Sequence, residues 1–432
     1  MRPLILLLSA SAILHLIWVM AIPMVKAPDE FAHYWMIDFM VSHARLPYAA
    51  EVHDGGASAV YGSMPAMGYL PHVAWGWLSR LVDHGAQLMD FTRWIRLGSV
   101  VCGLITIACA HYLGQKLFPP PYHPLIRWAL PLAVALHPQF NYVTAYANND
   151  ASTACISAII AVLIYKILKA GISASRSLCL GLAVGYLLLS KFSGYCILPA
   201  VAMVFAILYW QEARDQAARH DTDQPRRFKT ITHAILITAI AGSISVWCFL
   251  RNGDVFDGDF LGTRTMVAHW AEIYHKDPTA TQSLAHVLKE RTWWQLWFNS
   301  FYGCFGYLDM PLPNFLYQSF LGMIILSTGA LCLKGQEKEE NQLFWLYMGA
   351  AIILNFAAMV YAQMQNLGGG QGRYLFPCEI FVFAWMLRGL SRLPGKTALV
   401  ATCALLALLT AGTVCATVML VSSFGLSLAR SY

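Results

Sequence analysis

The hydrophobic pattern of the chain consists of long apolar runs separated by short polar stretches. Runs of membrane-spanning length fall at residues 4–23, 95–113, 125–146, 151–168, 231–250, 314–333, 343–361, 377–390 and 397–421. A membrane-spanning helix needs about 20 mostly apolar residues. The pattern therefore predicts a chain that crosses a membrane many times.

One further apolar stretch, residues 178–210, is too long for a single span. It is interrupted by the sequence SKFSG at 190–194. A charge at the bilayer centre costs roughly 2.5–3.5 kcal/mol on insertion scales. We therefore expect two short helices that meet at Lys191, which brings the predicted number of spans to eleven.

The composition agrees with this pattern. The chain is 58% hydrophobic and 12% charged, whereas about a quarter of the residues in a soluble domain are charged. The basic residues form no cluster of the kind that nucleic acid requires, so no nucleic-acid partner is expected. Its 11 cysteines include no C-x-x-C, which argues against a zinc site or a disulfide framework. We predict an all-α polytopic fold, with residues 1–432 forming one integral membrane domain and no separate soluble domain.

The charges of the loops predict the orientation of the spans. With the N-terminus in the cytoplasm, the inner loops at 114–127, 166–176, 211–230, 334–342 and 388–396 carry most of the loop Lys and Arg residues. The short outer loops at 147–150 and 362–376 contain only Arg373. The positive-inside rule therefore favours this orientation. It leaves two long external loops at about 24–94 and 251–313, the first with a helix-like run at 30–45.

The sequence "KAPDEFAHYWM" directly after the first run places Asp29 and Glu30 at the membrane edge. A carboxylate there can accept a proton from a hydroxyl group. If residues 29–33 are helical, His33 lies one turn from both acids, and the three side chains could hold a divalent metal ion, Mg²⁺ or Mn²⁺. The structural alternative is a helix start after Pro28, where acids are favoured in the first turn.

Other ionisable residues fall at the same predicted edge, and each has two interpretations. Asp150 ends "NND", which either forms a turn or contributes a second acid. Lys191 either extends to the interface or neutralises a phosphate group. Arg373 lies in "NLGGGQGRYLFP", where glycines allow the backbone to approach a ligand closely and the guanidinium suits phosphate oxygens. The alternative is a flexible hairpin with an arginine at the membrane interface. Asp309 and Glu379 are also predicted at this edge. Because these residues are all predicted at the outer edge of the membrane, they suggest one outward-facing cavity.

Five motifs occur in order: "PDEFAHY", "NND", "SKFSG", "FYGCFGYLDMPLP" and "QGRYLFP". Together they resemble a large bacterial family of predicted membrane proteins. That family looks like a branch of the GT-C superfamily of polyprenyl-phosphate-dependent glycosyltransferases. The resemblance implies a GT-C-like helical bundle with Asp29 as the essential acid, Glu30 beside it and Asp150 as a second acid. It makes Lys191 and Arg373 candidates for binding the lipid phosphate.

The resemblance also implies the reaction and its place. A sugar would move by inverting displacement from a polyprenyl-phosphate carrier to a glycan or lipid acceptor, at the outer face of the bacterial inner membrane. Neighbouring motif residues would assist, with Gln371 and Tyr374 near the phosphate, and His33, Tyr34, Asn149 and Asp309 near the substrate. Besides the divalent ion considered above, no cofactor is expected. The alternatives are a transporter or flippase of lipid-linked sugars, whose hallmark would be an internal repeat, or a ligase or polymerase of surface polysaccharide.

Overall fold

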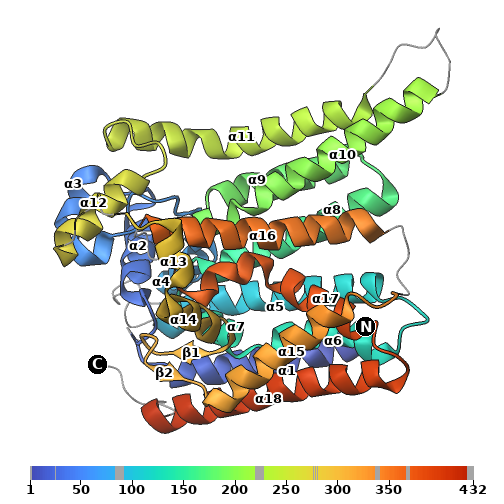
Figure 1. Cartoon of the computed structure of the whole chain (residues 1–432). Helices are drawn as coiled ribbons and strands as arrows, with labels where there is room; N and C mark the ends of the chain where they lie inside the picture. Colours follow the sequence, from blue (N-terminus) through green and yellow to red (C-terminus); the bar gives the residue numbers. More distant parts are fainter. Residues whose placement is uncertain are drawn as a thin grey trace.

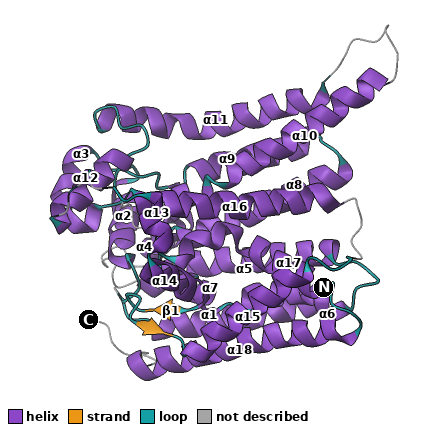
Figure 2. Ribbon diagram, viewed as in Figure 1, coloured by secondary structure: helices purple, strands orange, loops and turns teal. Residues whose placement is uncertain are grey.

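The computed structural model describes residues 2–24, 26–82, 92–218, 228–275, 277, 279, 281–335, 341–365 and 370–425. Within these residues the chain is built from helices, and the only sheet is a short antiparallel hairpin of β1 (Cys304–Phe305) and β2 (Met310–Pro311) (Figure 2). The predicted all-α polytopic class is therefore confirmed.

Twelve of the described helices form a bundle whose axes run roughly side by side (Figure 1). They are α1 (Arg2–Ala21), α5 (Thr92–Leu117), α6 (Pro124–Ala135), α7 (Pro138–Val143), α8 (Asp150–Ala170), α9 (Ala174–Leu188), α10 (Ile197–Ala218), α11 (Lys229–Val255), α15 (Asn314–Ala330), α16 (Gln342–Met364), α17 (Glu379–Leu390) and α18 (Lys396–Phe424).

Seven stretches of the described chain are long and apolar enough to cross a membrane. They comprise α1, α5, α8, α10 with the short turn before it, α11, α16 and α18. The helices α6 and α9 are apolar but shorter. The predicted count of eleven spans therefore stays a prediction.

One predicted span is divided in the structure. The run at 125–146 forms α6 and α7, which are separated at Leu136 and His137. Pro138 is the first residue of α7 and has no N–H to continue the hydrogen bonds of α6. The prediction of one continuous helix was therefore wrong.

The long stretch at 178–210 divides at the predicted place. The helix α9 ends at Leu188, a 3₁₀ turn η4 (Phe192–Gly194) follows, and α10 begins at Ile197. Lys191 itself is extended, with φ −160° and ψ 142°. The expectation of two helices that meet at Lys191 is confirmed.

The remaining described helices lie together at one end of the bundle, on the left in Figure 1. They are α2 (Glu30–His43), α3 (Ala49–Asp54), α4 (Leu70–Val82), α12 (Thr263–Tyr274), α13 (Leu284–Lys289) and α14 (Arg291–Tyr302), with the 3₁₀ turns η1 (Gly56–Ala59) and η2 (Met67–Tyr69). The connections α5–α6, α8–α9 and α17–α18 lie at the opposite end. We call the left end the external end, following the predicted orientation.

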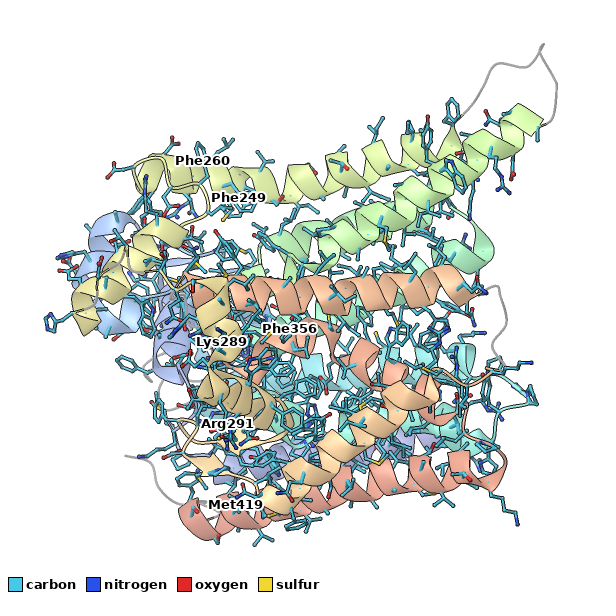
Figure 3. All side chains as sticks on the ribbon, in the orientation of Figure 1. Phe249, Phe260, Lys289, Arg291, Phe356 and Met419 are labelled. Carbon is cyan, nitrogen blue, oxygen red and sulfur yellow. The ribbon has the colours of Figure 1, made fainter. Side chains whose placement is uncertain are left out.

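Apolar side chains fill the space between the helices, and others cover the outside of the bundle (Figure 3). On the outer surface, Ile235 of α11 is 65% exposed and Ile353 of α16 is 69% exposed. An apolar outer surface is expected where lipid chains surround a helix bundle. All 11 cysteines are free thiols, so the prediction that they form no disulfide framework is confirmed.

Candidate active site

Four charged side chains meet at the external end, and we call them the charge cluster: Asp29, Asp150, Lys191 and Arg373. The Lys191 Nζ atom lies 2.6 Å from Asp150 Oδ1, and the guanidinium of Arg373 donates a hydrogen bond to Asp29 Oδ2. Arg373 Nε lies 3.8 Å from the second oxygen of Asp150. Two acids and two bases, far apart in the sequence, therefore form one connected group.

Asp29 lies between α1 and α2 in an unusual backbone conformation. It occupies the N-cap position of α2, but its side chain makes no capping hydrogen bond. Its φ of 59° and ψ of 4° place it in the left-handed region, which a residue with a side chain seldom adopts. Such strain persists only where surrounding structure holds it. Here the Arg373 guanidinium also donates to the carbonyl of Pro28, so it holds the turn on both sides.

Asp150 is the first residue of α8, and the turn before it is built by Asn148. The side-chain oxygen of Asn148 accepts from the backbone N–H of Ala151 at 3.0 Å, and its amide nitrogen donates to two backbone carbonyls. The turn interpretation of "NND" is therefore confirmed, and a role of Asp150 as a second acid stays a prediction. Asn148 forms the turn, and the turn directs Asp150 into the charge cluster.

Lys191 lies in the break between α9 and η4, with 16% of its side chain exposed. Its ammonium group stands 5.1 Å from the centre of the Tyr374 ring as well as contacting Asp150. The side chain therefore points into the protein, and extension to a membrane interface does not describe it.

Arg373 belongs to the 3₁₀ turn η6 (Gly372–Cys378) and is buried. Its guanidinium donates to the hydroxyl of Tyr146 at 3.0 Å. The preceding Gly372 has to be glycine, because a Cβ atom there would lie 2.2 Å from the backbone nitrogen of Phe301. The close approach at this glycine is to the backbone of α14, whereas the expected approach of the glycine-rich segment to a ligand stays a prediction. Residues 366–369 of the glycine-rich motif lie outside the described residues.

The electrostatics of Asp29 favour its charged form. Burial alone would raise the pKa of its carboxyl group, but the positive charges of Arg373 and Lys191 outweigh that effect and lower the pKa below its usual value. About a quarter of the Asp29 side chain is exposed, compared with 3% of the Arg373 side chain. Asp29 is therefore the most exposed member of the charge cluster.

Several buried polar atoms around the charge cluster have no hydrogen-bond partner. They are His33 Nε2, Asn149 Oδ1, Asp150 Oδ2, Gln371 Oε1 and Arg373 Nε. Buried polar groups are almost always satisfied in native proteins, and exceptions call for an explanation. Asp150 Oδ2 and Arg373 Nε face each other at 3.8 Å, whereas the other three atoms have no hydrogen-bond partner and indicate a place for a polar ligand. Of the motif residues predicted near the phosphate, Tyr374 lies beside both cations and Gln371 precedes η6.

One side of the site consists of aromatic residues. His33 stacks on Tyr61 with ring centres 5.0 Å apart, and its Nδ1 atom is hydrogen-bonded to the hydroxyl of Tyr69 at 2.6 Å. His33 lies one turn along α2 from Asp29, as the sequence predicts. The sequence analysis did not single out Tyr61, Tyr69 or Tyr146, because tyrosines in apolar surroundings carry no signal that separates them from core residues.

Glu30 has a different partner from Asp29 and does not face the charge cluster. Arg96 of α5 binds both oxygens of Glu30 at 2.8 and 2.7 Å, and both side chains are buried. Arg96 also donates to the carbonyls of Val19, Ile22 and Pro23. In the sequence, Arg96 is marked only by its position at the start of the apolar run at 95–113. Glu30 therefore fastens the end of α1 to α5, and its expected place beside the base is corrected.

The three side chains considered for a metal ion, Asp29, Glu30 and His33, do not form a group of ligands in the structure. No group of three His, Cys, Asp or Glu side chains in the described residues could hold a metal ion. The reason is local, because the helix begins at Glu30 rather than Asp29 and Glu30 is engaged by Arg96. Tyr34 lies on this side as well, within 3.3 Å of Thr92 Oγ1, and so is not among the residues around the charge cluster.

Two further acids expected at this edge take no part in the charge cluster. Asp309 is exposed in the turn of the β1–β2 hairpin and takes no part in the ion pairs of the described chain. Glu379 is buried and hydrogen-bonded to His137 Nδ1 at 2.8 Å, among aromatic rings. Asn149 lies next to the charge cluster, where its Cβ atom packs against Gly68.

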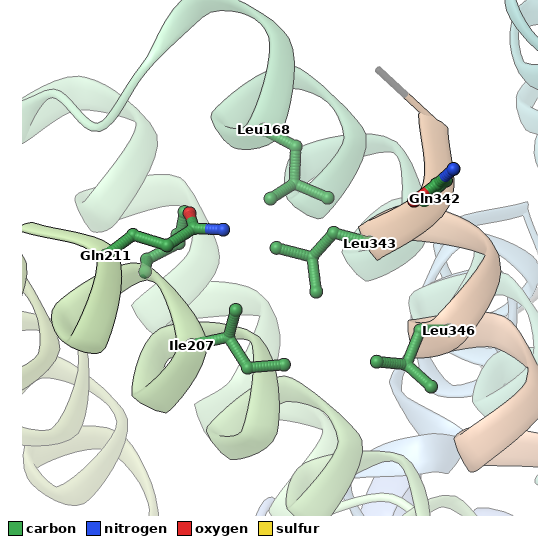
Figure 4. Close-up of a pocket in the computed structure, with 7 residues that line it drawn as sticks. Leu168, Ile207, Gln211, Gln342, Leu343 and Leu346 are labelled. Atoms are coloured by element: carbon green, nitrogen blue, oxygen red, sulfur yellow. The ribbon is translucent and has the colours of Figure 1, made fainter. Parts of the chain in front are cut away.

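One cavity lies away from this site. Its volume is about 530 Å³, and it is bordered by Leu168 of α8, Ile207, Leu208 and Gln211 of α10, and Gln342, Leu343 and Leu346 of α16 (Figure 4). Leu168 is near the opposite end of α8 from Asp150, about 27 Å along the axis at 1.5 Å per residue. The cavity is therefore separate from the charge cluster.

Comparisons with known proteins give a family and a set of similar structures. The family of predicted membrane proteins DUF2142 matches residues 101–384, a range that contains Asp150, Lys191 and Arg373. ArnT from Cupriavidus metallidurans bound to undecaprenyl phosphate is similar at 13% identity and a TM-score of 0.41, over 95% of this chain and 77% of that one.

The oligosaccharyltransferase of Archaeoglobus fulgidus, tethered to an acceptor peptide containing the NVT sequon, is similar at 13% identity and a TM-score of 0.45. The match covers 99% of this chain and 56% of that one, so the chain spans little more than half the length of the archaeal protein. Both neighbours are GT-C glycosyltransferases. A search of curated proteins finds no match.

Proposed function

The chain belongs to the DUF2142 family of predicted membrane proteins, and we propose that it is a glycosyltransferase that moves a sugar from a polyprenyl-phosphate carrier to a glycan or lipid acceptor. The observation that carries the proposal is the charge cluster. Two cations and a partly exposed carboxylate meet at one end of a membrane bundle, beside buried polar atoms without partners.

The cations suit a phosphate that arrives from the membrane. A polyprenyl phosphate keeps its chain among lipids and its phosphate at headgroup level. Arg373 presents a planar fork and Lys191 a compact positive charge, both suited to phosphate oxygens. The unpartnered Nε of Arg373 is a ready donor. When the phosphate binds, it competes with Asp29 for the Arg373 guanidinium, so binding of the donor releases the carboxylate.

The released Asp29 is then the base for an inverting displacement. The acceptor hydroxyl gives its proton to the Asp29 carboxylate while its oxygen bonds to the anomeric carbon of the sugar. The bond from that carbon to the phosphate oxygen breaks, and the phosphate leaves with the electron pair on the lipid carrier. Lys191 and Arg373 stabilise the negative charge that develops on it. Asp150 holds Lys191 in place at 2.6 Å and so orients the phosphate site.

The proposal includes a location, the outer face of the bacterial inner membrane. Cysteines introduced singly at Asp54 of α3 and Asp257, both exposed, should react with a membrane-impermeant thiol reagent in a cysteine-free background. A cysteine at Ser175, at the opposite end of the bundle, should react only after the membrane is made permeable. The reverse pattern would place the charge cluster in the cytoplasm and exclude the proposed orientation.

The reaction is tested by mass spectrometry of surface glycans and lipid-linked sugars in a deletion strain. We expect one sugar to disappear from a glycan or lipid and its polyprenyl-phosphate form to accumulate. Wild type and Asp38→Asn should restore the glycan, since Asp38 lies on α2 with half of its side chain exposed. Asp29→Asn should not restore it. Unchanged glycans and unchanged lipid-linked sugars in the deletion strain would contradict a transferase.

A further inference from the structure

His33 is held firmly, but one of its ring nitrogens has no partner. The ring is buried, stacks on Tyr61 and is hydrogen-bonded through Nδ1 to Tyr69. Its Nε2 atom is buried without a partner. The charged groups that act on the ring are Lys191, Asp29, Arg373 and Asp150, which are the four members of the charge cluster. The ring therefore borders the site without being part of its ion pairs.

The protonation of the ring follows from its neighbours. Burial, aided by Lys191, lowers the pKa of His33 to about 3, so the imidazole is neutral at physiological pH. Burial raises the pKa of Tyr69, so its hydroxyl keeps its hydrogen. Within the described residues the only hydrogen-bond partner of that hydroxyl is His33 Nδ1, so Tyr69 donates to it. The neutral ring then carries its hydrogen on Nε2.

We infer that His33 is a specificity-determining residue whose Nε2–H donates a hydrogen bond to an oxygen of the transferred sugar. This inference rests on the proposed function and deepens it. The two cations satisfy the phosphate charge, whereas a neutral donor suits an uncharged hydroxyl or ring substituent. Because Tyr61 and Tyr69 fix the ring, the donor is in place before the sugar arrives. A buried donor that needs a partner oxygen disfavours a ligand that lacks one.

The test compares carriers with and without a sugar. The purified full-length protein in nanodiscs is titrated with undecaprenyl phosphate and with a set of undecaprenyl-phosphate-linked hexoses and pentoses. The variants are His33→Phe, which keeps the ring stack but loses the donor, and His33→Gln, whose amide can still donate. His43→Phe is the matched control, because His43 lies on the same helix and is exposed.

We expect wild type to bind at least one sugar-bearing carrier more tightly than the bare carrier. His33→Phe should reduce that preference about tenfold, the worth of one hydrogen bond, while changing binding of the bare carrier less than about twofold. His33→Gln should recover part of the preference, and His43→Phe should match wild type.

Three results would overturn the inference. Equal losses for bare and sugar-bearing carriers in His33→Phe would show that His33 only shapes the site. Unchanged binding of both would show that it has no role. A wild type that binds the bare carrier but prefers no sugar-bearing form would leave the phosphate site standing and remove the sugar contact. Failure of the proposed function looks different, because wild type would then bind neither form of the carrier.

Discussion

Asp29 and Glu30 are adjacent carboxylates, and each is paired with an arginine, but the two pairs are built differently. The Glu30–Arg96 pair is buried and held at both oxygens, and its arginine also satisfies three backbone carbonyls. The Asp29–Arg373 pair is partly open, starts from a left-handed backbone, and leaves Arg373 Nε without a hydrogen bond. One pair is complete without a ligand, and the other is not.

The difference teaches how to separate a structural acid from a reactive one where sequence alone cannot. Residue type and position are nearly the same for both acids. What differs is the number of satisfied hydrogen bonds and the strain of the backbone. An ion pair whose hydrogen-bonding atoms are all satisfied has no free atom with which to bind a substrate. In a strained pair with unsatisfied atoms, a substrate can replace one partner at a smaller cost in free energy.

The largest effect is expected from breaking the Glu30–Arg96 pair. Arg96→Met leaves the Glu30 carboxylate buried without its cation and removes three hydrogen bonds to backbone carbonyls. Loss of one partner of a buried pair typically costs about 3–5 kcal/mol, so the variant should be scarce in membranes and unfold well below wild type in detergent. The double variant Glu30→Gln, Arg96→Met should recover part of the loss. Normal unfolding of Arg96→Met would contradict a structural role for the pair.

Asp29→Asn should have the opposite profile. Asparagine has the shape of aspartate, tolerates the left-handed backbone and can still accept a hydrogen bond from Arg373, so yield and unfolding temperature should stay close to wild type. Sugar transfer in a membrane assay should fall by about 10²-fold or more, because the general base is lost. Glu30→Gln is the matched comparison. Its sugar transfer should fall in proportion to its loss of folded protein, because Glu30 acts through the fold. Near-normal transfer by Asp29→Asn would remove Asp29 from the mechanism.

A smaller effect is expected when the charge of Arg373 is kept but its shape is changed. In Arg373→Lys an ammonium group cannot contact Asp29, Tyr146 and the carbonyl of Pro28 together, as the fork does. Losing one or more hydrogen bonds to charged groups, worth about 1.5–3 kcal/mol each, should weaken donor binding by about 10-fold or more. The measurement is the Kd for undecaprenyl phosphate, with Arg45→Lys in the exposed Arg45–Glu51 pair as control. Unchanged affinity would place the phosphate elsewhere.

The smallest expected effect is on the pH dependence of stability. The pKa of His33 is about 3 in the folded protein and about 6.5 when unfolded. Its contribution is therefore fully present above about pH 6.5 and is lost as the pH falls, because the unfolded state takes up the proton. From about pH 7.5 to 5.5 this costs wild type about 1.4 kcal/mol of unfolding free energy.

His33→Phe removes that cost, so the difference in unfolding free energy between wild type and this variant should change by about this amount over the range. His43→Phe provides the baseline. Equal pH dependence in wild type and His33→Phe would show that the ring is not held neutral.

The sequence predicted the architecture better than it predicted the contacts. Helix periods, the break at Lys191 and the common level of Asp29, Asp150, Lys191 and Arg373 all follow from where charge can stand in an apolar run. The division of the run at 125–146 into α6 and α7 was not predicted. The run is apolar throughout, and the missing N–H of Pro138, which interrupts the helix, does not change its hydrophobic pattern. The orientation of the bundle in the membrane remains a prediction from loop charges.

The partner of each acid depended on facts that one sequence does not contain. The side chains of Asp29 and Glu30 point to different partners because α2 begins between them, at Glu30. A difference of one residue in the start of this helix decides which acid faces the charge cluster. Arg96 looked like an ordinary residue at a span end, since nothing local shows that it lies opposite Glu30. The three tyrosines of the site are indistinguishable from core residues until distant segments are brought together.

The two ion pairs also differ in when they can form as the protein is made. Arg96 follows Glu30 by 66 residues, whereas Arg373 follows Asp29 by 344. At about 5–20 residues per second, the second interval lasts about 20–70 s. In a partly synthesised chain the Glu30–Arg96 pair can therefore connect α1 to α5 early, before Arg373 has been synthesised and can pair with Asp29. A chain that ends before its last spans would contain the Glu30–Arg96 pair but lack Arg373. It would therefore insert into the membrane without a complete charge cluster.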